Sequence, residues 1–392
     1  MESVFVLSAK RTPQGSFGGV LSSLSAVQLG TVAIEAALDA SGIVSGDVQE
    51  VYMGNVCQAN LGQAPARQAA LAAGISDGVP ATTVNKVCAS GMKALMLGAQ
   101  SIQLGINDVV VCGGMESMSN IPYYAPYQRW GRKYGDASLV DGLVKDGLTD
   151  AFDQVAMGAL ADAVSRQQSI SREDQDAYAI QSYERARLAT ESGAFDSEIT
   201  PVHVPQRKGD NLVIRQDEEY KKVNFEKIPQ LRPAFSPDGT ATAANASTIN
   251  DGAAALVLAG ESYVHKMGLQ PLARLTRYCD AALAPEQFTL APIKAAQKLM
   301  HQQGKSTSQI DLFEVNEAFA MVPLAFVNAC GISQDVINIH GGGVSLGHPI
   351  GVSGARIVTT LIHALHQKNL HTGLAAICNG GGGGSALMLE KI

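Results

Sequence analysis

A sequence unit that occurs in both halves of the chain constrains the fold more than any other feature. Ser90–Leu95 and Ser353–Val358 each begin with Ser-Gly and open an apolar, helix-like run. Each run leads to a strand-like segment that ends in a Cys and a Gly, Val109–Gly114 in one half and Ala375–Gly380 in the other. Such self-similarity is typical of a duplicated supersecondary unit. We therefore expect two copies of one α/β unit that pack face to face.

Short β-rich runs and helical patterns alternate along the rest of the chain, which indicates the α/β fold class. Val4–Ser8 predicts the first strand. Ser25 and Gln28 have the spacing of a capping box, which predicts a helix that starts there and ends near Gly42. Further predictions are strands at Val51–Val56, Val109–Cys112, Ile249–Ala259 and Val336–Ile339, a helix at Ala89–Leu104 and a solvent-exposed helix at Asp174–Arg187.

The middle of the chain differs in character from the two halves. Residues 119–248 contain several prolines and most of the dense charge, which is typical of exposed surface. A functional interpretation is a loop domain that meets a polyanionic substrate. We predict a first core half from residues 1–118 with 249–270, a loop domain from 119–248 and a second core half from 271–392.

The composition bounds the classes of protein that need to be considered. Hydrophobic residues make up 46% and charged residues 17%, so the chain can bury a large core and is not disordered. No apolar run approaches the ~20 residues of a membrane helix. The net charge of -7 argues against a nucleic-acid partner. The N-terminus lacks leader features, so we expect a cytoplasmic protein, or a mitochondrial one from which a leader has been removed.

Several familiar motifs are absent or incomplete. The glycine run Gly380–Gly384 has neither the P-loop nor the dinucleotide-binding pattern. Ser345 stands in a Gly-x-Ser-x-Gly sequence, but Glu390 is the only later acidic residue and no His follows it, which excludes the hydrolase order. None of the six cysteines forms a Cys-x-x-Cys pair. Three histidines lie close together and are expected on a solvated helix end: His363, His366 and His371.

Four chemically capable residues stand at helix starts and strand ends of the duplicated unit. Cys88 lies where the first repeated helix begins, and the partial positive charge of a helix N-terminus favours a thiolate there. His348 precedes the matching helix of the second repeat. Cys378 ends a strand directly before the glycine run, and Asn316 follows another strand. If the halves pack with pseudo-twofold symmetry, Cys88 and His348 approach each other from opposite sides.

These segments together resemble the thiolase family over nearly the whole chain. Within the family, the sequence is most similar to the acetyl-CoA acetyltransferases, also called acetoacetyl-CoA thiolases. The resemblance implies a layered αβαβα core of duplicated domains with an inserted loop domain. It implies reversible Claisen condensation of two acetyl-CoA to acetoacetyl-CoA and CoA. The matching segments are Asn85–Ala94, Gly113–Met118, Lys145–Asp150, Asn245–Ser247, Asn250–Ala254, Asn316–Phe319, Gly347–Gly351 and Cys378–Gly384.

The resemblance also implies a role for each candidate residue. Cys88 takes the acetyl group as a thioester, and His348 accepts the proton of Cys88. Cys378 removes a proton from the methyl group of the second acetyl-CoA. Asn316, through a bound water, joins His348 in one oxyanion hole. The backbone N–H groups of Cys88 and Gly380 form the other.

Ligand positions and assembly are implied by the same resemblance. A potassium ion is expected, along with a homotetramer built as a dimer of dimers, to which Val109–Cys112 and residues 119–145 contribute. Ala156 stands where many relatives have His, which puts one polar contact to the pantetheine arm in doubt. The CoA-contacting positions are Tyr183, Lys222, Val223, Asn224, Lys227 and Ser247. The potassium positions are Tyr183, Ala243, Ala244, Ala246 and Val344.

Three alternatives remain beside this interpretation. A 3-ketoacyl-CoA thiolase of longer chain specificity shares every catalytic residue. A carrier-protein-dependent ketoacyl synthase uses Cys with two His, and Cys378 stands where the second His would be. A non-catalytic acyl-CoA-binding protein on the same scaffold would not need all four polar groups.

Overall fold

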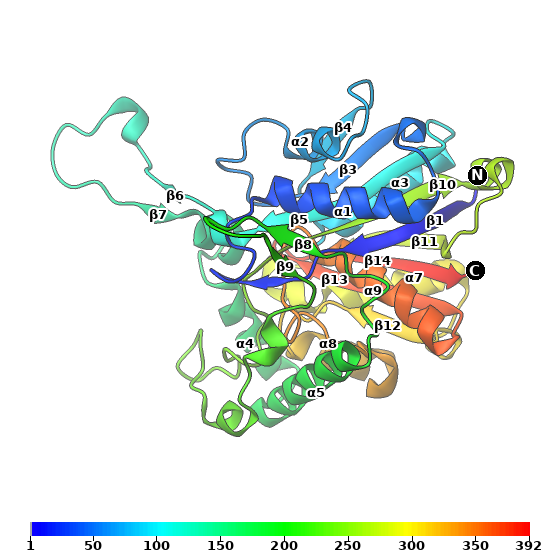
Figure 1. The fold of residues 1–392 in the computed structure, drawn as a ribbon. Coiled ribbons are helices and arrows are strands. Elements are labelled where there is room, and N and C mark those ends of the chain that lie inside the picture. Colours follow the sequence, from blue (N-terminus) through cyan, green and yellow to red (C-terminus); the bar gives the residue numbers. More distant parts are fainter. Residues whose placement is uncertain (1) are drawn as a thin grey trace.

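The computed structural model describes residues 2–392 and contains one large sheet covered by helices (Figure 1). Nine strands follow the order β12-β13-β14-β11-β1-β10-β5-β3-β4, and β2 pairs with β10. The strands of this sheet are β1 (Val4–Arg11), β2 (Gly15–Ser16), β3 (Glu50–Gly54), β4 (Ala81–Val84), β5 (Val109–Ser117), β10 (Asn250–Gly260), β11 (Ala273–Ala282), β12 (Leu312–Val315), β13 (Thr372–Asn379) and β14 (Gly383–Lys391).

The helices lie on both faces of this sheet. None of them, within the described chain, is long and apolar enough to cross a membrane. Two small hairpins, β6 (Tyr123–Tyr124) with β7 (Val140–Asp141) and β8 (Val202–Val204) with β9 (Leu212–Ile214), stand apart from the sheet. The helices are α1 (Ala26–Ser41), α2 (Pro65–Ala72), α3 (Ser90–Gln103), α4 (Met157–Gln167), α5 (Arg172–Glu191), α6 (Glu261–Met267), α7 (Ala291–Gln303), α8 (Met321–Cys330) and α9 (Ser353–Lys368).

Three hydrophobic clusters arrange these elements in five layers. The middle cluster holds α3 and α9 between the strands of the two halves. A second cluster joins α1 and α2 to the outer face of the first half, and a third joins α7 and α8 to that of the second. Strand residues alternate between the clusters: on β10, Leu256 and Leu258 face the middle, whereas Ala255 and Val257 face outward. The predicted αβαβα layering of a duplicated α/β core is confirmed.

The repeated Ser-Gly pair marks where the two halves come closest. A Cβ on Gly91 would lie 2.8 Å from the backbone nitrogen of Ala355, and a Cβ on Gly354 would lie 2.5 Å from that of Met92. Only glycine permits this approach of two helix starts. The halves also join edge to edge, because β1 pairs with β11 antiparallel, with Val4 opposite Leu275.

Some predictions for individual helices and strands are confirmed, and others are wrong. The Ser25 capping box is present, and α1 ends at Gly42 in the left-handed region, as the sequence predicts. Val336–Ile339 is not a strand: it is a short turn with isolated bridges, and Asn338 has φ of 48°. The helix predicted at Asp174–Arg187 is α5, but it is solvated on one face only.

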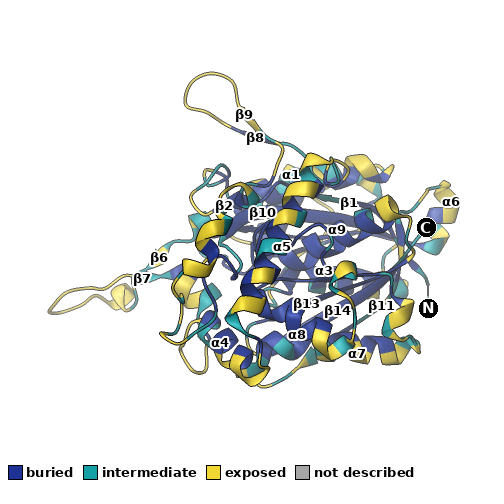
Figure 2. Cartoon of the chain, turned by 90° about the horizontal axis from the view of Figure 1, so that it is seen from below, coloured by how far each residue is buried: buried dark blue, intermediate teal, exposed yellow. Residues whose placement is uncertain are grey.

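The buried face of α5 carries side chains that periodicity alone did not reveal. Tyr178 and Tyr183 are buried there among residues of the second half. Val202 and Val204 of β8 join the cluster under α1 instead. Some buried side chains of residues 119–248 therefore pack against the first half and others against the second. The predicted domain boundaries remain a prediction. Figure 2 shows the β6–β7 hairpin as an exposed arm that projects from the body.

Candidate active site

A cavity of about 690 Å³ brings the candidate residues of both halves together. Cys88 from the first half and His348 and Gly380 from the second half all line it. Cys88 and His348 therefore share one cavity, as their predicted approach requires. The remaining lining residues are Val56, Asn85, Val87, Lys145, Asp146, Gly147, Leu148, Thr149, Asp150, Ala151, Gln154, Met157, Ser247, Phe288, Ala318, Phe319, Ile350 and Gly381.

A strained turn presents Cys88 at the start of α3. Val87 has φ of 47°, a left-handed conformation that a β-branched residue rarely adopts. The Ser90 hydroxyl holds the turn: it donates to the Val87 carbonyl at 2.6 Å and accepts from the Lys86 N–H at 2.8 Å. Lys86 Nζ in turn lies 2.6 Å from Asp280 of the second half. The turn is thus fixed to both halves.

The resting Cys88 is a neutral thiol. Burial raises its pKa to about 11, although the N–H groups of Gly380 and of Cys88 itself act on the sulfur and lower the pKa, and Glu116 raises it. The N–H groups at the helix start favour the thiolate, as the sequence indicates, but desolvation outweighs them in the ligand-free protein. The two N–H groups are those expected in one oxyanion hole.

His348 is a buried, neutral imidazole. Burial and the nearby Arg356 lower its pKa to about 3. Its Nδ1 lies 2.5 Å from the Ser353 hydroxyl, and its backbone N–H donates to Asn250 at 2.9 Å. Among residues 2–392, no hydrogen bond occupies Nε2, so this nitrogen remains available toward the cavity. A neutral thiol beside a neutral imidazole suits proton transfer during attack.

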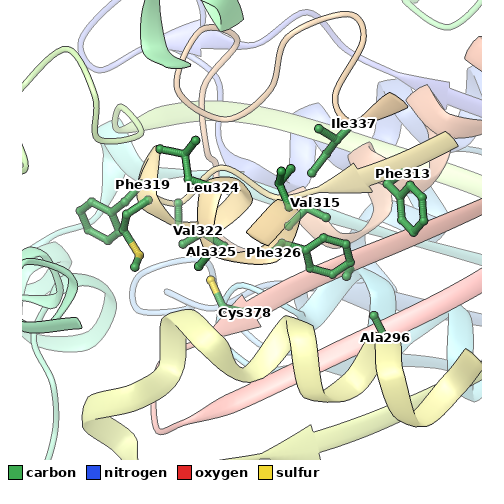
Figure 3. Packing of buried hydrophobic residues seen from close by; sticks show 14 of the residues in the cluster. Ala296, Phe313, Val315, Phe319, Val322, Leu324, Ala325, Phe326, Ile337 and Cys378 are labelled. Carbon is green, nitrogen blue, oxygen red and sulfur yellow. The ribbon is translucent and has the colours of Figure 1, made fainter. Parts of the chain in front are cut away.

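Cys378 and Asn316 are fully buried and are not among the residues that line the cavity. Burial raises the pKa of the Cys378 thiol, and the Cys88 sulfur raises it further. Figure 3 shows Cys378 pointing toward Ala325 of α8. Both polar atoms of the Asn316 side chain lack a partner within the described chain. A buried amide with free donor and acceptor atoms fits the water that the family resemblance implies.

Glu116 is a buried carboxylate that bridges the two halves and was not singled out from the sequence. Glu116 accepts backbone N–H bonds from Val56 at 2.9 Å and Cys57 at 3.2 Å in the first half and from Gly351 at 2.9 Å in the second. Burial raises its pKa to about 7 despite these donors. The signal was an acidic residue at the end of an apolar strand, β5.

Lys145–Asp150 was identified from the sequence as a matching segment, but not as a segment whose residues line the cavity. Val144–Leu148 forms one π-helical turn, a feature common at functional sites, and its residues from Lys145 to Leu148 line the cavity. Met157, Phe288 and Phe319 supply apolar walls. Ala156 is exposed beside Met157 and presents only a methyl group there.

The predicted CoA positions are not gathered at this cavity. Ser247 lines it, whereas Lys222 pairs with Glu218 at 2.9 Å and Asn224 caps a short turn by accepting from Glu226 N–H at 3.1 Å. Val223 packs near the buried Tyr183, and Lys227 is exposed. CoA binding by the predicted positions other than Ser247 remains a prediction.

The predicted potassium positions satisfy a simple test of fit. Tyr183 and Val344 pack together in one buried cluster, and Ala244 and Ala246 are buried, whereas Ala243 is exposed. Burial raises the pKa of Tyr183, and Glu219 and Glu317 raise it further, so the surroundings favour positive charge. None of the four carbonyl oxygens accepts a hydrogen bond within residues 2–392. Free carbonyls beside carboxylates suit a hard monovalent cation.

Other metal or histidine sites do not emerge from the described residues. Within 2–392, no three His, Cys, Asp or Glu side chains cluster as metal ligands. His366 and His371 are exposed as expected, but His363 is partly buried, with Nε2 2.9 Å from the Ala9 carbonyl. Ser345 is fully buried and bonds Ser182 at 2.8 Å, which is a structural role.

Known protein families and individual proteins match this chain over nearly its whole length. Residues 4–262 match the family model for the thiolase N-terminal domain, and residues 269–391 match that for the thiolase C-terminal domain. A probable acetyl-CoA acetyltransferase of Dictyostelium discoideum is 52% identical over 392 residues, which cover 100% of this chain and 95% of that one.

Two further relatives differ in the location that their names give. A cytosolic acetyl-CoA acetyltransferase of Gibberella zeae is 50% identical over 99% of this chain and 98% of its own. A mitochondrial one of Rattus norvegicus is 50% identical over 100% of this chain and 92% of its own. The crystal structure of a thiolase from Ascaris suum in complex with coenzyme A superposes with a TM-score of 0.95, at 46% identity over 100% of both chains.

Proposed function

The chain belongs to the thiolase family, and from this membership we propose that it is an acetyl-CoA acetyltransferase. The enzyme condenses two acetyl-CoA to acetoacetyl-CoA and CoA, and catalyses thiolysis in reverse. The observation that carries this proposal is the single cavity in which Cys88 of one half meets His348 and Gly380 of the other.

The first half-reaction transfers an acetyl group to Cys88. The sulfur attacks the thioester carbonyl carbon while its proton moves to His348 Nε2. The N–H groups of Cys88 and Gly380 bind the developing oxyanion, and losing one such donor typically raises a barrier by ~3–4 kcal/mol. The bond to the CoA sulfur then breaks, and that sulfur takes the proton of the Cys378 thiol. Acetyl-Cys88, a Cys378 thiolate and a protonated His348 remain.

The second half-reaction forms the carbon–carbon bond. The Cys378 thiolate removes a methyl proton from a second acetyl-CoA. His348 Nε2–H and a water held by Asn316 bind the enolate oxygen. The carbanion attacks acetyl-Cys88, the carbon–sulfur bond breaks, and the Cys88 sulfur recovers its proton from His348. Every group returns to the neutral state in which the structure holds it.

CoA and potassium complete this proposal. The thioester end of CoA enters past Ser247, and the predicted residues of the 222–227 turn meet the rest of the molecule. Potassium would be held by Tyr183 and the carbonyls of the four predicted positions. It would supply positive charge that orders the segment carrying Val344, which leads into the His348 loop.

Assembly as a homotetramer is proposed from the exposed arm. The β6–β7 hairpin carries Tyr127, Trp130 and Tyr134, each 88% exposed or more. Aromatic side chains at such exposure are typical of interface anchors. The expected contribution of Val109–Cys112 is wrong, because those residues are fully buried inside β5. A cytoplasmic location is proposed, with the mitochondrion as the alternative, because some relatives are named as cytosolic and others as mitochondrial.

A chain-length series tests the proposed activity. Purified protein is mixed with CoA and 3-ketoacyl-CoA substrates of increasing length, and acetyl-CoA production is followed by mass spectrometry. The proposal predicts that acetoacetyl-CoA is the preferred substrate. Preference for long chains would favour the 3-ketoacyl-CoA thiolase, and no turnover of any substrate would favour an acyl-CoA-binding protein.

A further inference from the structure

We propose that Ser353 is a positioning residue that holds His348 in one tautomer, with the proton on Nδ1 and the lone pair on Nε2. Ser353 is the first residue of α9 and is fully buried. The inference rests on the proposed function, in which Nε2 accepts the Cys88 proton and later donates from the same atom. It adds the residue that determines which nitrogen does so.

The direction of the hydrogen bonds follows from the proton count. The Ser353 Oγ lies 3.0 Å from the Pro349 carbonyl oxygen and 2.5 Å from His348 Nδ1. A carbonyl oxygen has no proton, so the hydroxyl must donate to it; otherwise two oxygen lone pairs would face each other. The hydroxyl has one proton only. His348 Nδ1 must therefore donate to Oγ, which leaves Nε2 without a proton.

A hydroxyl partner also keeps the protonated imidazole short-lived. A carboxylate at this place would stabilise the imidazolium, as in a Ser-His-Asp arrangement. Here the partner is neutral, the N-terminus of α9 carries partial positive charge, and the buried Arg356 lies one turn further along the same helix. The helix N-terminus and Arg356 disfavour positive charge on His348, and the neutral hydroxyl does not offset them. The proton that it takes from Cys88 is therefore readily donated again at Nε2.

Kinetics of matched variants test this role. Ser353→Ala is expected to lower kcat for acetoacetyl-CoA thiolysis by about 100-fold, the order of one general acid–base contribution, with little change in KM. Ser353→Thr keeps the hydroxyl and should restore most of kcat. Ser165→Ala is the control, because the buried Ser165 hydroxyl donates to the Ala161 carbonyl at 2.9 Å in the same i to i−4 manner, with no histidine attached.

Nitrogen NMR of ¹⁵N-histidine-labelled protein gives a readout independent of turnover. The His348 signals are assigned by their loss in His348→Asn. The inference predicts a proton on Nδ1 and none on Nε2 in the wild type and in Ser353→Thr, and a substantial Nε2–H population in Ser353→Ala. A wild-type Nε2–H tautomer would overturn the inference, as would an unchanged tautomer and kcat in Ser353→Ala.

The proposed activity and the proposed role of Ser353 can be refuted separately. A wild-type protein that lacks thiolysis but shows the Nδ1–H tautomer would refute the proposed activity and leave the role of Ser353 intact. An active wild-type protein with the Nε2–H tautomer would do the reverse. Because the wild-type spectrum alone decides the tautomer, the test stands even if Ser353→Ala does not fold.

Discussion

Gly91 and Gly354 occupy equivalent positions, each the second residue of its helix, and each lies against the backbone of the other helix. A Cβ on either would come within 2.8 Å of a backbone nitrogen across the middle layer. This contact fixes the start of α3 relative to the start of α9. Because Cys88 and His348 precede these helix starts, the same contact sets where the nucleophile and its base meet.

Gly354→Ala is expected to destabilise the protein and to lower activity. The added methyl group must push against the Met92 backbone, and overpacking of this kind costs about 1–3 kcal/mol. Denaturant unfolding and thiolysis assays measure both effects. Gly46→Ala is the control, since nothing lies within 4 Å of a Cβ there. Equal stability of the two variants would show that the helix starts are not in tight contact.

The ultraviolet absorbance of the thiolate tests the resting state of Cys88. Since burial raises the pKa of Cys88 to about 11, the thiolate should be negligible at neutral pH and increase as pH rises toward that value. The pKa of His348 is lowered to about 3, so at neutral pH and above its imidazole is uncharged and cannot stabilise the thiolate. The difference between wild type and Cys88→Ala isolates the signal. Thiolate absorbance at neutral pH that disappears on acidification would instead indicate an ion pair.

Exchange of potassium for sodium at constant ionic strength tests the ion proposal. Potassium at about ten times its dissociation constant would raise the free energy of unfolding by about 1.4 kcal/mol, and thiolysis should be faster. Thermal unfolding and initial rates in the two salts provide the measurement. Tyr183→Phe, which removes one oxygen ligand, should reduce the difference between the salts. Identical thermal unfolding and identical initial rates of the wild type in both salts would contradict the proposed potassium site.

The exposed arm is tested through its tryptophan, the only one in the chain. Trp130 is 90% exposed in one subunit, so Trp130→Ala should shift the assembly from tetramer to dimer in light-scattering chromatography. Leu104→Ser is the matched control, because Leu104 is 72% exposed at the end of α3, away from the arm. A tetramer that persists in Trp130→Ala, or one that dissociates in Leu104→Ser, would place the interface elsewhere.

The sequence was sufficient to predict features that depend on local chemistry or on repetition. The Ser25 capping box and the Gly42 stop determine α1 within one segment, and the repeated Ser-Gly pair revealed the duplication. The meeting of Cys88 and His348 followed from that duplication, because equivalent helix starts converge near a pseudo-twofold axis.

Features that depend on contacts distant in sequence could not be predicted. The Glu116 carboxylate bridges the two halves through backbone N–H groups that carry no sequence signal. The protonation state of Cys88 depends on burial, which the helix start does not reveal. The polar composition of α5 concealed the face that packs against the second half.

Mass spectrometry of the Cys378→Ala variant after incubation with acetyl-CoA tests the central claim most directly. This variant should accumulate one acetyl group on Cys88, since the CoA sulfur can leave as an anion while the condensation lacks its base. Cys88→Ala should carry none. The absence of the adduct from Cys378→Ala, or its location on any other residue, would contradict the account.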